Sequence, residues 1–284
     1  MYHAKALGKN AYQYFQASMN SAVLERAALE AKLRRAMAEH HLSLHYQPQI
    51  DPLTMEVLGL EALLRWTDPD SGPISPGAFI PLAEETGLIL PIGEWVIDEA
   101  CRQAKLWDAR GLRAVPISVN VSGVQFEHQD VAEIVRLAVT RHHLPPGRLE
   151  IEITESAIMS HPERAVAALK TLREAGVGVA LDDFGTGYSS LSYLRRFPID
   201  TLKIDRSFIL EIDTNREDAE IVAAIVAMAH TLGLRVIVEG VETDAQLRVI
   251  IAKHCDIVQG FVFSRALPAN EIPTLLSGPL RRSA

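Results

Sequence analysis

The chain has 284 residues, of which 48% are hydrophobic and 23% charged, and its formal net charge is −8. This composition predicts a folded protein with one large domain or two small ones, and the negative charge excludes a broad surface for DNA or RNA duplexes. No apolar run is long enough to span a bilayer, and two cysteines are too few for a disulfide framework, so we expect a soluble, cytoplasmic domain.

The first 40 residues lack a core of their own. A helix end stopped by Gly8 and an extended stretch near Tyr12 fall within residues 1–20. Over residues 21–40 apolar side chains recur at helical spacing, with Glu, Lys and Arg on the opposite face. We interpret this segment as a linker helix that leads into a main domain at residues 41–284.

From residue 42 onward, short strand-like runs alternate with amphipathic helices. The predicted strands are 42–50, 58–65, 115–121, 149–155, 177–183, 200–205, 234–241 and 256–263. The predicted helices are 77–87, 92–110, 124–143, 161–175, 189–196, 215–232 and 243–253. This alternation predicts an α/β fold, a TIM-like (β/α)8 barrel. Because about seven residues separate the first two strands, no helix can connect them, and we expect an antiparallel first strand.

Asp182 and Asp183 come directly after a buried run and precede a loop with Gly185 and Gly187. Two adjacent carboxylates repel one another and resist desolvation, so at a strand end they need cations or hydrogen-bond donors. A metal site is one interpretation. The other is that one Asp caps the next helix while its neighbour stays solvated.

Each of the eight predicted strands carries polar residues towards its end, where a barrel of this kind has its active site. In chain order they are Gln47, Glu61, Asn120, Glu152, Asp182 with Asp183, Lys203, Glu239 and Gln259. Any one of them has an ordinary explanation, since a glutamate can face outward on a strand and a lysine can reach solvent. Together, five inward carboxylates and an asparagine cannot share a barrel mouth uncompensated.

Hard oxygen ligands without His or Cys indicate Mg²⁺ or Mn²⁺. The residues that could hold one ion are Glu61, Asn120, Glu152 and Asp182. Asp182 could bridge to a second ion that Asp183 helps to hold. Two such ions would activate a water and stabilise an in-line displacement at phosphorus. The pattern therefore predicts phosphodiester hydrolysis.

Lys203 admits two chemical roles. A lysine at the end of a barrel strand can form a Schiff base, which would make the protein a lyase of the aldolase type. Beside carboxylates its pKa should be held up, which favours orienting or deprotonating a metal-bound water instead. Arg65 follows Glu61 on the same strand and is placed to bind a phosphate oxygen.

The motifs resemble those of EAL domains, the cyclic di-GMP phosphodiesterases. Residues 61–66 read Glu-Ala-Leu-Leu-Arg-Trp, similar to that family's signature. The other matching segments, in the family's order, are Tyr46-Gln47-Pro48, Asn120-Val121-Ser122, Glu152-Ile153-Thr154-Glu155, Asp182-Asp183-Phe184-Gly185-Thr186-Gly187, Lys203-Ile204-Asp205, Val238-Glu239-Gly240-Val241-Glu242-Thr243 and Gln259-Gly260-Phe261. The resemblance covers about residues 40–275 and implies hydrolysis of cyclic di-GMP to linear pGpG by a metal-activated water, with two Mg²⁺ or Mn²⁺ ions.

The resemblance also implies roles for single residues. The implied metal ligands are Glu61, Asn120, Glu152, Asp182, Asp183 and Glu239. The implied catalytic residues are Lys203, Glu61, Asp182, Glu239 and Glu155, of which Lys203 is the base or water-positioning group and Glu155 steadies the glycine loop. The implied substrate contacts are Gln47, Arg65, Asp205 and Gln259.

Residues 1–20 resemble the last helix and strand of a GGDEF, or diguanylate cyclase, domain. The chain is therefore interpreted as part of a GGDEF–EAL protein of bacterial signalling, whose upstream segments could attach it to the inner membrane. The family also implies a homodimer through the loop after Asp183. An alternative from a different class is a catalytically silent receptor for cyclic di-GMP, although such receptors usually lack metal ligands that are present here.

Overall fold

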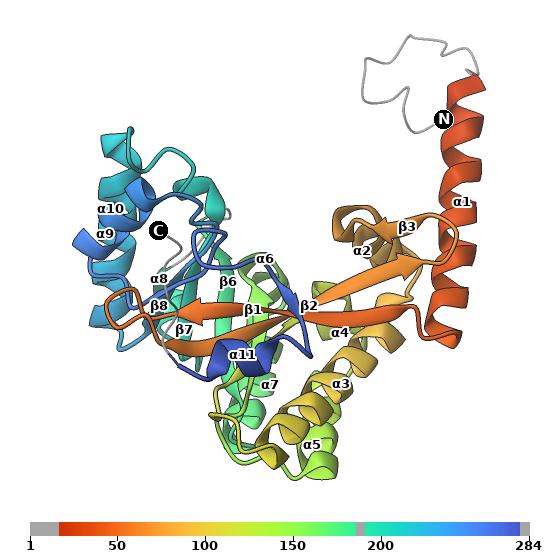
Figure 1. Ribbon diagram of the computed structural model, residues 1–284, viewed down its shortest axis with the longest axis horizontal. Helices are drawn as coiled ribbons and strands as arrows, with labels where there is room; N and C mark the ends of the chain where they lie inside the picture. Colours follow the sequence, from red (N-terminus) through yellow and green to blue (C-terminus); the bar gives the residue numbers. More distant parts are fainter. Residues whose placement is uncertain (1–16, 186–190, 279–284) are drawn as a thin grey trace.

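The computed structural model describes residues 17–185 and 191–278 (Figure 1). The strands are β1 (Leu42–Ile50), β2 (Val57–Asp68), β3 (Gly72–Ile74), β4 (Ile117–Val121), β5 (Leu149–Thr154), β6 (Gly178–Phe184), β7 (Thr201–Ile204), β8 (Arg235–Val238), β9 (Ile257–Val258) and β10 (Leu267–Pro268). The helices are α1 (Ala17–Ala38), α2 (Pro76–Glu85), α3 (Ile89–Ala109), α4 (Gly123–His128), α5 (Val131–His142), α6 (Glu155–Ser160), α7 (Pro162–Glu174), α8 (Leu191–Leu194), η2 (Arg206–Phe208), α9 (Arg216–Thr231), α10 (Asp244–Ala252) and α11 (Ile272–Leu276).

Eight strands close into a barrel in the order β1, β2, β4, β5, β6, β7, β8, β9 and back to β1. Every neighbouring pair from β2 to β9 is parallel, whereas β1 is antiparallel to both β2 and β9. The predicted barrel with an antiparallel first strand is confirmed. The short strands β3 and β10 extend the sheet outside this ring, because β3 pairs with the end of β2 and β10 with the middle of β1.

The parallel strands form where short apolar runs are buried on both faces, between the barrel interior and the surrounding helices. Some helix starts are marked by side chains that satisfy free backbone N–H groups. Ser122 and Gln125 form a capping box at α4, and Thr243 and Gln246 form another at α10. Both boxes follow directly after polar residues at a strand end, so they fix where the chain leaves the barrel mouth.

Two predicted elements were wrong in detail. The segment 124–143 is not one helix: α4 ends before Gln129, whose backbone is extended, and Asp130 caps a second helix by accepting the N–H of Glu133. The last strand is two residues long rather than spanning 256–263. After Val258 the N–H of Gln259 still donates to the carbonyl of Val238 on β8, but the carbonyl of Gln259 and the N–H of Val262 bond to Val241, in the loop that follows β8.

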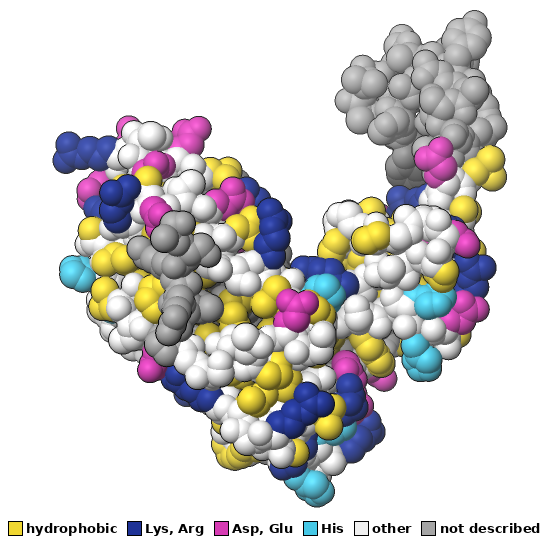
Figure 2. Space-filling view, viewed as in Figure 1, with side chains coloured by type: hydrophobic (Ala, Val, Ile, Leu, Met, Phe, Trp, Pro, Cys, Tyr) yellow, Lys and Arg dark blue, Asp and Glu magenta, His cyan; other side chains and the backbone are white. Residues whose placement is uncertain are grey.

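The predicted linker helix is α1, and it packs on the rest of the molecule. Its side chains Leu33 and Ala36 are buried, and Lys32 Nζ lies 3.0 Å from Asp68 Oδ1 at the end of β2. Figure 2 shows a broad notch between the lobe of α9 and α10 and the lobe of α2 and β3, and α6 lies at its base in the same view. No helix in the described ranges is long and apolar enough to cross a membrane.

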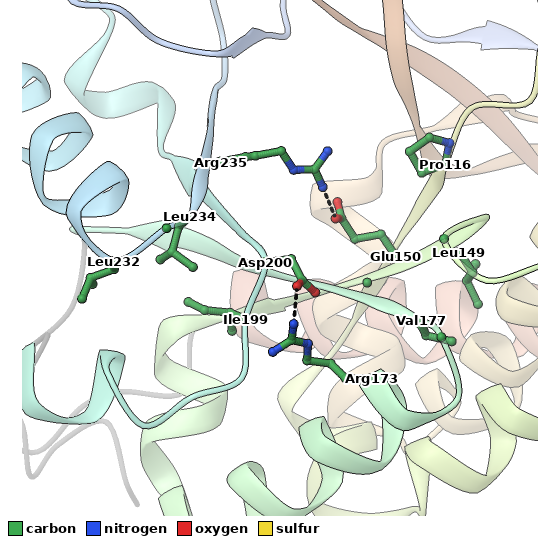
Figure 3. A pocket seen from close by; sticks show the side chains of 14 residues that line it. Pro116, Leu149, Glu150, Arg173, Val177, Ile199, Asp200, Leu232, Leu234 and Arg235 are labelled. Carbon is green, nitrogen blue, oxygen red and sulfur yellow. Dashed lines mark hydrogen bonds and ion pairs between the residues drawn. The ribbon is translucent and has the colours of Figure 1, made fainter.

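The end of the barrel opposite the mouth holds a hollow of about 880 Å³ (Figure 3). Its polar groups are already paired. Glu150 of β5 is buried and accepts hydrogen bonds from Ser118 (3.1 Å), Thr201 (3.1 Å) and Arg235 (3.3 Å). These bonds join β4, β5, β7 and β8, so Glu150 ties the barrel floor together.

We expect Glu150→Ala to lower the free energy of unfolding by about 2–4 kcal/mol, because each buried donor left without an acceptor costs about 1–3 kcal/mol. Urea denaturation followed by tryptophan fluorescence measures the change. The control is Glu163→Ala on the surface of α7, whose ion pair with Arg196 is exposed and contributes at most about 1 kcal/mol. Equal stability of the two variants would contradict the role of Glu150.

Candidate active site at the barrel mouth

The side chain of Lys203, on β7, lies at the centre of the barrel interior and has no solvent exposure. Its ammonium is surrounded by acidic side chains from four other strands or strand ends. The distances from Nζ are 2.5 Å to Glu152, 2.6 Å to Glu239, 3.2 Å to Asp182 and 3.8 Å to Glu61. The contacts to Glu152 and Asp182 are hydrogen bonds, whereas the one to Glu239 is an ion pair outside hydrogen-bond geometry.

Glu61, on β2, is oriented by two amide side chains. Asn120 Nδ2 donates to Glu61 Oε1 at 2.7 Å, and Gln259 Nε2 donates to Glu61 Oε2. Gln259 also donates to Gln47 Oε1 at 3.2 Å, and Gln47 in turn donates to the carbonyl of Ser264 at 3.1 Å. Both of these hydrogen bonds to Glu61 come from amide N–H groups, which act as donors at any pH.

The pKa values show how this cluster divides its charge. Burial raises the pKa of Glu152 well above its usual range, and it raises that of Glu239 to about 8 against the pull of Lys203. Burial also acts on Glu61, but Lys203 and the two amide donors outweigh it and lower the pKa of that carboxyl. Burial alone would lower the pKa of Lys203, but the surrounding carboxylates outweigh burial and raise the pKa of Lys203 well above the ordinary value. The amine is therefore held as an ammonium.

Asp182 and Asp183 end β6 in a turn with unusual backbone geometry. Asp182 is buried, and its Oδ1 accepts the N–H of Asp183 at 2.8 Å. Asp183 has a φ of 54°, in the left-handed region that few residues other than glycine adopt. Burial, Asp182 and Asp205 raise the pKa of the Asp183 carboxyl. Glu155 Oε2 accepts the N–H of Gly185 at 3.4 Å, so Glu155 contacts the start of the glycine loop.

The remaining predicted residues lie at the rim. Arg65 is half-buried on β2, donates to the carbonyl of Leu64 at 2.9 Å, and burial lowers its pKa. Asp205 caps η2 by accepting the N–H of Ser207 at 3.0 Å. The predicted dimer contact, the loop after Asp183, falls largely on residues 186–190, which lie outside the described residues, and so do residues 1–16 of the predicted GGDEF remnant.

Two smaller hollows border this cluster. One, of about 260 Å³, lies between Gln47, Glu61 and Glu239, and its outer wall includes Arg206 and Phe261. The other, of about 280 Å³, is more apolar and lies between Arg65, Asn120 and helices α2 and α3. Sequence reasoning gave no role to Arg206, which directly follows the motif Lys203-Ile204-Asp205, or to Phe261, which is the last residue of the motif Gln259-Gly260-Phe261.

The donor set fits divalent cations. Among the described residues no three acidic, His or Cys side chains surround one point as a ready metal site, because Lys203 Nζ fills the point on which the carboxylates converge. Four carboxylates against one ammonium still leave excess negative charge, which cations can neutralise in place of protons. In addition, Oε1 of the fully buried Glu152 accepts no hydrogen bond within the described chain. Oxygen donors of this kind suit Mg²⁺ or Mn²⁺.

The sequence model of the family described as "EAL domain" matches residues 30–266. The chain is 48% identical over 272 residues to "Bifunctional diguanylate cyclase/cyclic di-GMP phosphodiesterase MucR" of Pseudomonas aeruginosa, which covers 96% of this chain and 40% of that protein. It is 41% identical over 268 residues to "Cyclic di-GMP phosphodiesterase NbdA" of the same species, covering 94% and 34%. The chain thus spans less than half the length of these relatives.

A solved structure shows the same architecture. The structure described as "PaMucR Phosphodiesterase, c-di-GMP complex" matches with a TM-score of 0.83 at 48% identity, and the match covers 86% of this chain and 99% of that chain. The structural similarity therefore extends over most of this chain.

We expect Lys203→Met to destabilise the metal-free protein by about 3–5 kcal/mol at pH 8, because it removes the one cation among buried carboxylates. The loss should be smaller at pH 5, below the raised pKa of Glu239, since protonation then neutralises the carboxyls. Urea denaturation at both pH values measures it, with Lys203→Arg as the charge-preserving control. A loss that is equal at both pH values would contradict the charge argument.

Proposed function

The chain belongs to the EAL domain family, and on that premise we propose that it hydrolyses cyclic di-GMP to linear pGpG with the help of divalent metal ions. The observation that carries the proposal is the convergence of Glu61, Glu152, Asp182 and Glu239 on Lys203 at the mouth of the barrel. A buried cluster this acidic is costly for folding alone, and it suits cation-assisted chemistry on a phosphodiester.

The residues that would hold the metal ions are Glu61, Asn120, Glu152, Asp182, Asp183 and Glu239. When bound, two Mg²⁺ or Mn²⁺ ions supply Lewis acidity at the phosphate and lower the pKa of a water at the site. The turn at Asp182 and Asp183 supports a shared role for these two residues, because consecutive carboxylates at a strand end can each face a different ion.

The proposed role of Lys203 follows from its protonation. Its pKa is raised well above the ordinary value, so the group is an ammonium at neutral pH. An ammonium has no free electron pair, which makes it unsuited to Schiff base formation and unsuited to act first as a base. We assign it to orienting the attacking water and to stabilising negative charge on the phosphate. In the metal-free protein burial raises the pKa of Glu239 to about 8, so a metal ion that bound there would displace a proton.

The substrate would enter the two hollows that border the cluster. Arg65 lines the apolar hollow and presents a guanidinium for a phosphate oxygen. Gln47 and Gln259 line the other hollow, where Gln259 donates hydrogen bonds to both Gln47 and Glu61. They therefore orient a metal ligand as well as bordering the substrate, and direct contact with a nucleotide requires them to exchange these hydrogen bonds.

The first test is incubation of the purified chain with cyclic di-GMP, with Mg²⁺ or Mn²⁺ and then with excess EDTA, while chromatography follows the nucleotides. We expect pGpG to appear only with metal, because the carboxylate cluster needs cations to bind an anionic phosphate. Tight binding without product would instead support the receptor alternative. Metal-independent turnover would contradict the proposed chemistry.

A matched pair of variants on β5 tests the site itself. Glu152 and Glu150 are both buried glutamates that point into the barrel, but Glu152 faces the mouth and Glu150 the floor. We expect Glu152→Gln to reduce kcat/KM at least about 100-fold, since even groups behind metal ligands cost 10- to 100-fold. Glu150→Gln should retain activity within about threefold, because a glutamine keeps an acceptor for the floor donors. A similar loss in both variants would contradict the assignment.

A further inference from the structure

The turn that carries Asp183 is strained and must be held by its surroundings. Asp183 has a φ of 54° and Gly185 a φ of 97°, so two of three consecutive residues lie in the left-handed region. For a residue other than glycine this conformation costs of order 1 kcal/mol or more and persists only when neighbouring groups impose it. The N–H of Gly185 bonds to Glu155, but this bond at 3.4 Å is long. At the start of the turn, Asp182 Oδ1 accepts the N–H of Asp183 at 2.8 Å.

The aromatic ring of Phe208 provides a second contact. A Cβ atom placed on Gly185 would lie 2.8 Å from both Cε2 and Cζ of Phe208, so the ring edge covers the open side of this glycine. Phe208 is the last residue of η2, 23 residues further along the chain, and its ring is partly buried against the core. No motif considered from the sequence pointed to this residue.

The turn that presents Phe208 is itself anchored. Asp205 caps its start by accepting the N–H of Ser207, and Ile209, the next residue after Phe208, is fully buried. Gln246 of α10 donates to the carbonyls of Ile209 (3.1 Å) and Leu210 (3.3 Å). A ring mounted on a turn held from both ends can resist movement of the glycine that it contacts.

We propose that Phe208 is a positioning residue, whose ring holds the Asp183–Gly185 turn in the geometry that presents Asp183 to a metal ion. The inference rests on the proposed metal-dependent function. Strand β7 and the turn after it then have separate roles at the mouth. The strand carries the Lys203 ammonium, and the turn sets the position of the Asp183 carboxylate on the neighbouring strand β6. The contact of Phe208 at the mouth is with Gly185, so we assign its effect to the backbone of that glycine.

The first test needs no metal. In the metal-free protein, amide hydrogen exchange at Gly185 should become about tenfold faster or more in Phe208→Ala, because the turn opens more often. The control is Val222→Ala, which removes a fully buried side chain on α9 that serves no role at the mouth. Unchanged exchange in Phe208→Ala, or equal acceleration in Val222→Ala, overturns the proposal. If Phe208→Ala does not fold, Phe208→Leu, which keeps part of the ring volume, takes its place.

The second test measures metal binding directly. Electron paramagnetic resonance of Mn²⁺ titrated without substrate should show the weaker site losing about 10- to 100-fold in affinity in Phe208→Ala, as for other groups that orient metal ligands. If the unaltered protein binds Mn²⁺ and Phe208→Ala binds it equally well, the role of Phe208 is wrong and the proposed function stands. If the unaltered protein binds no Mn²⁺, the proposed cofactor is wrong, and the exchange experiment alone decides whether Phe208 holds the turn.

A double-mutant cycle separates the contact from general damage. Gly185→Ala places a methyl group against the Phe208 ring and also strains the backbone at positive φ. Removing the ring relieves the first effect but not the second, so the loss of Mn²⁺ affinity in Gly185→Ala with Phe208→Ala should be clearly less than the product of the single losses. Strictly multiplicative losses would overturn the proposed contact.

Discussion

The ammonium of Lys203 among buried carboxylates is the interaction on which the rest of the mouth depends. Four acidic side chains point to one interior region, and among the described residues Lys203 is the one cation that forms ion pairs with them. Such a cluster persists because the barrel buries enough apolar surface around it to hold the strands in place despite the cost of desolvated charge. The raised pKa values of Glu152 and Glu239 are the direct sign of that cost. They also explain why divalent cations would bind there.

The two ends of the barrel use buried charge in opposite ways. At the floor, Glu150 has a hydroxyl, a second hydroxyl and a guanidinium as partners, so its charge is satisfied and the hollow beside it is framed by closed ion pairs (Figure 3). At the mouth, two residues further along the same strand, Glu152 keeps an oxygen without a donor. A satisfied network stabilises a fold, whereas an unsatisfied one leaves binding capacity for a ligand.

The antiparallel first strand shapes the mouth on one side. Because β1 runs against β2, Gln47 lies directly opposite Glu61, and because β1 also closes the barrel against β9, Gln47 reaches Gln259. The amide side chains of Gln47 and Gln259 therefore support Glu61 where β1 closes the barrel against β9. On the other side, β6 and β7 are parallel neighbours, and the turns that follow them meet through Phe208 and Gly185. Both supports act on carboxylates rather than on substrate.

Much of this architecture could be predicted from local pattern. The strand boundaries of the parallel core follow from apolar runs bounded by polar residues, and the short gap before β2 indicates an antiparallel pair, because both are features of neighbouring residues. The long last strand was misjudged because Gly260 and its neighbours look apolar and extended, although their backbone bonds go to a loop. Likewise Gln129 and Asp130 divide a helix whose apolar spacing continues across the break.

By itself the sequence determined the barrel and the set of polar residues at its strand ends, since the alternation of strand and helix and the position of a side chain along a strand are local properties. Only the tertiary structure decided that Lys203 stands at the centre of the carboxylates, that Gln47 and Gln259 orient Glu61, and that Phe208 covers Gly185. These contacts join residues 21 to 212 positions apart. Their distances depend on how the closed barrel places one strand end beside another, which no local pattern contains.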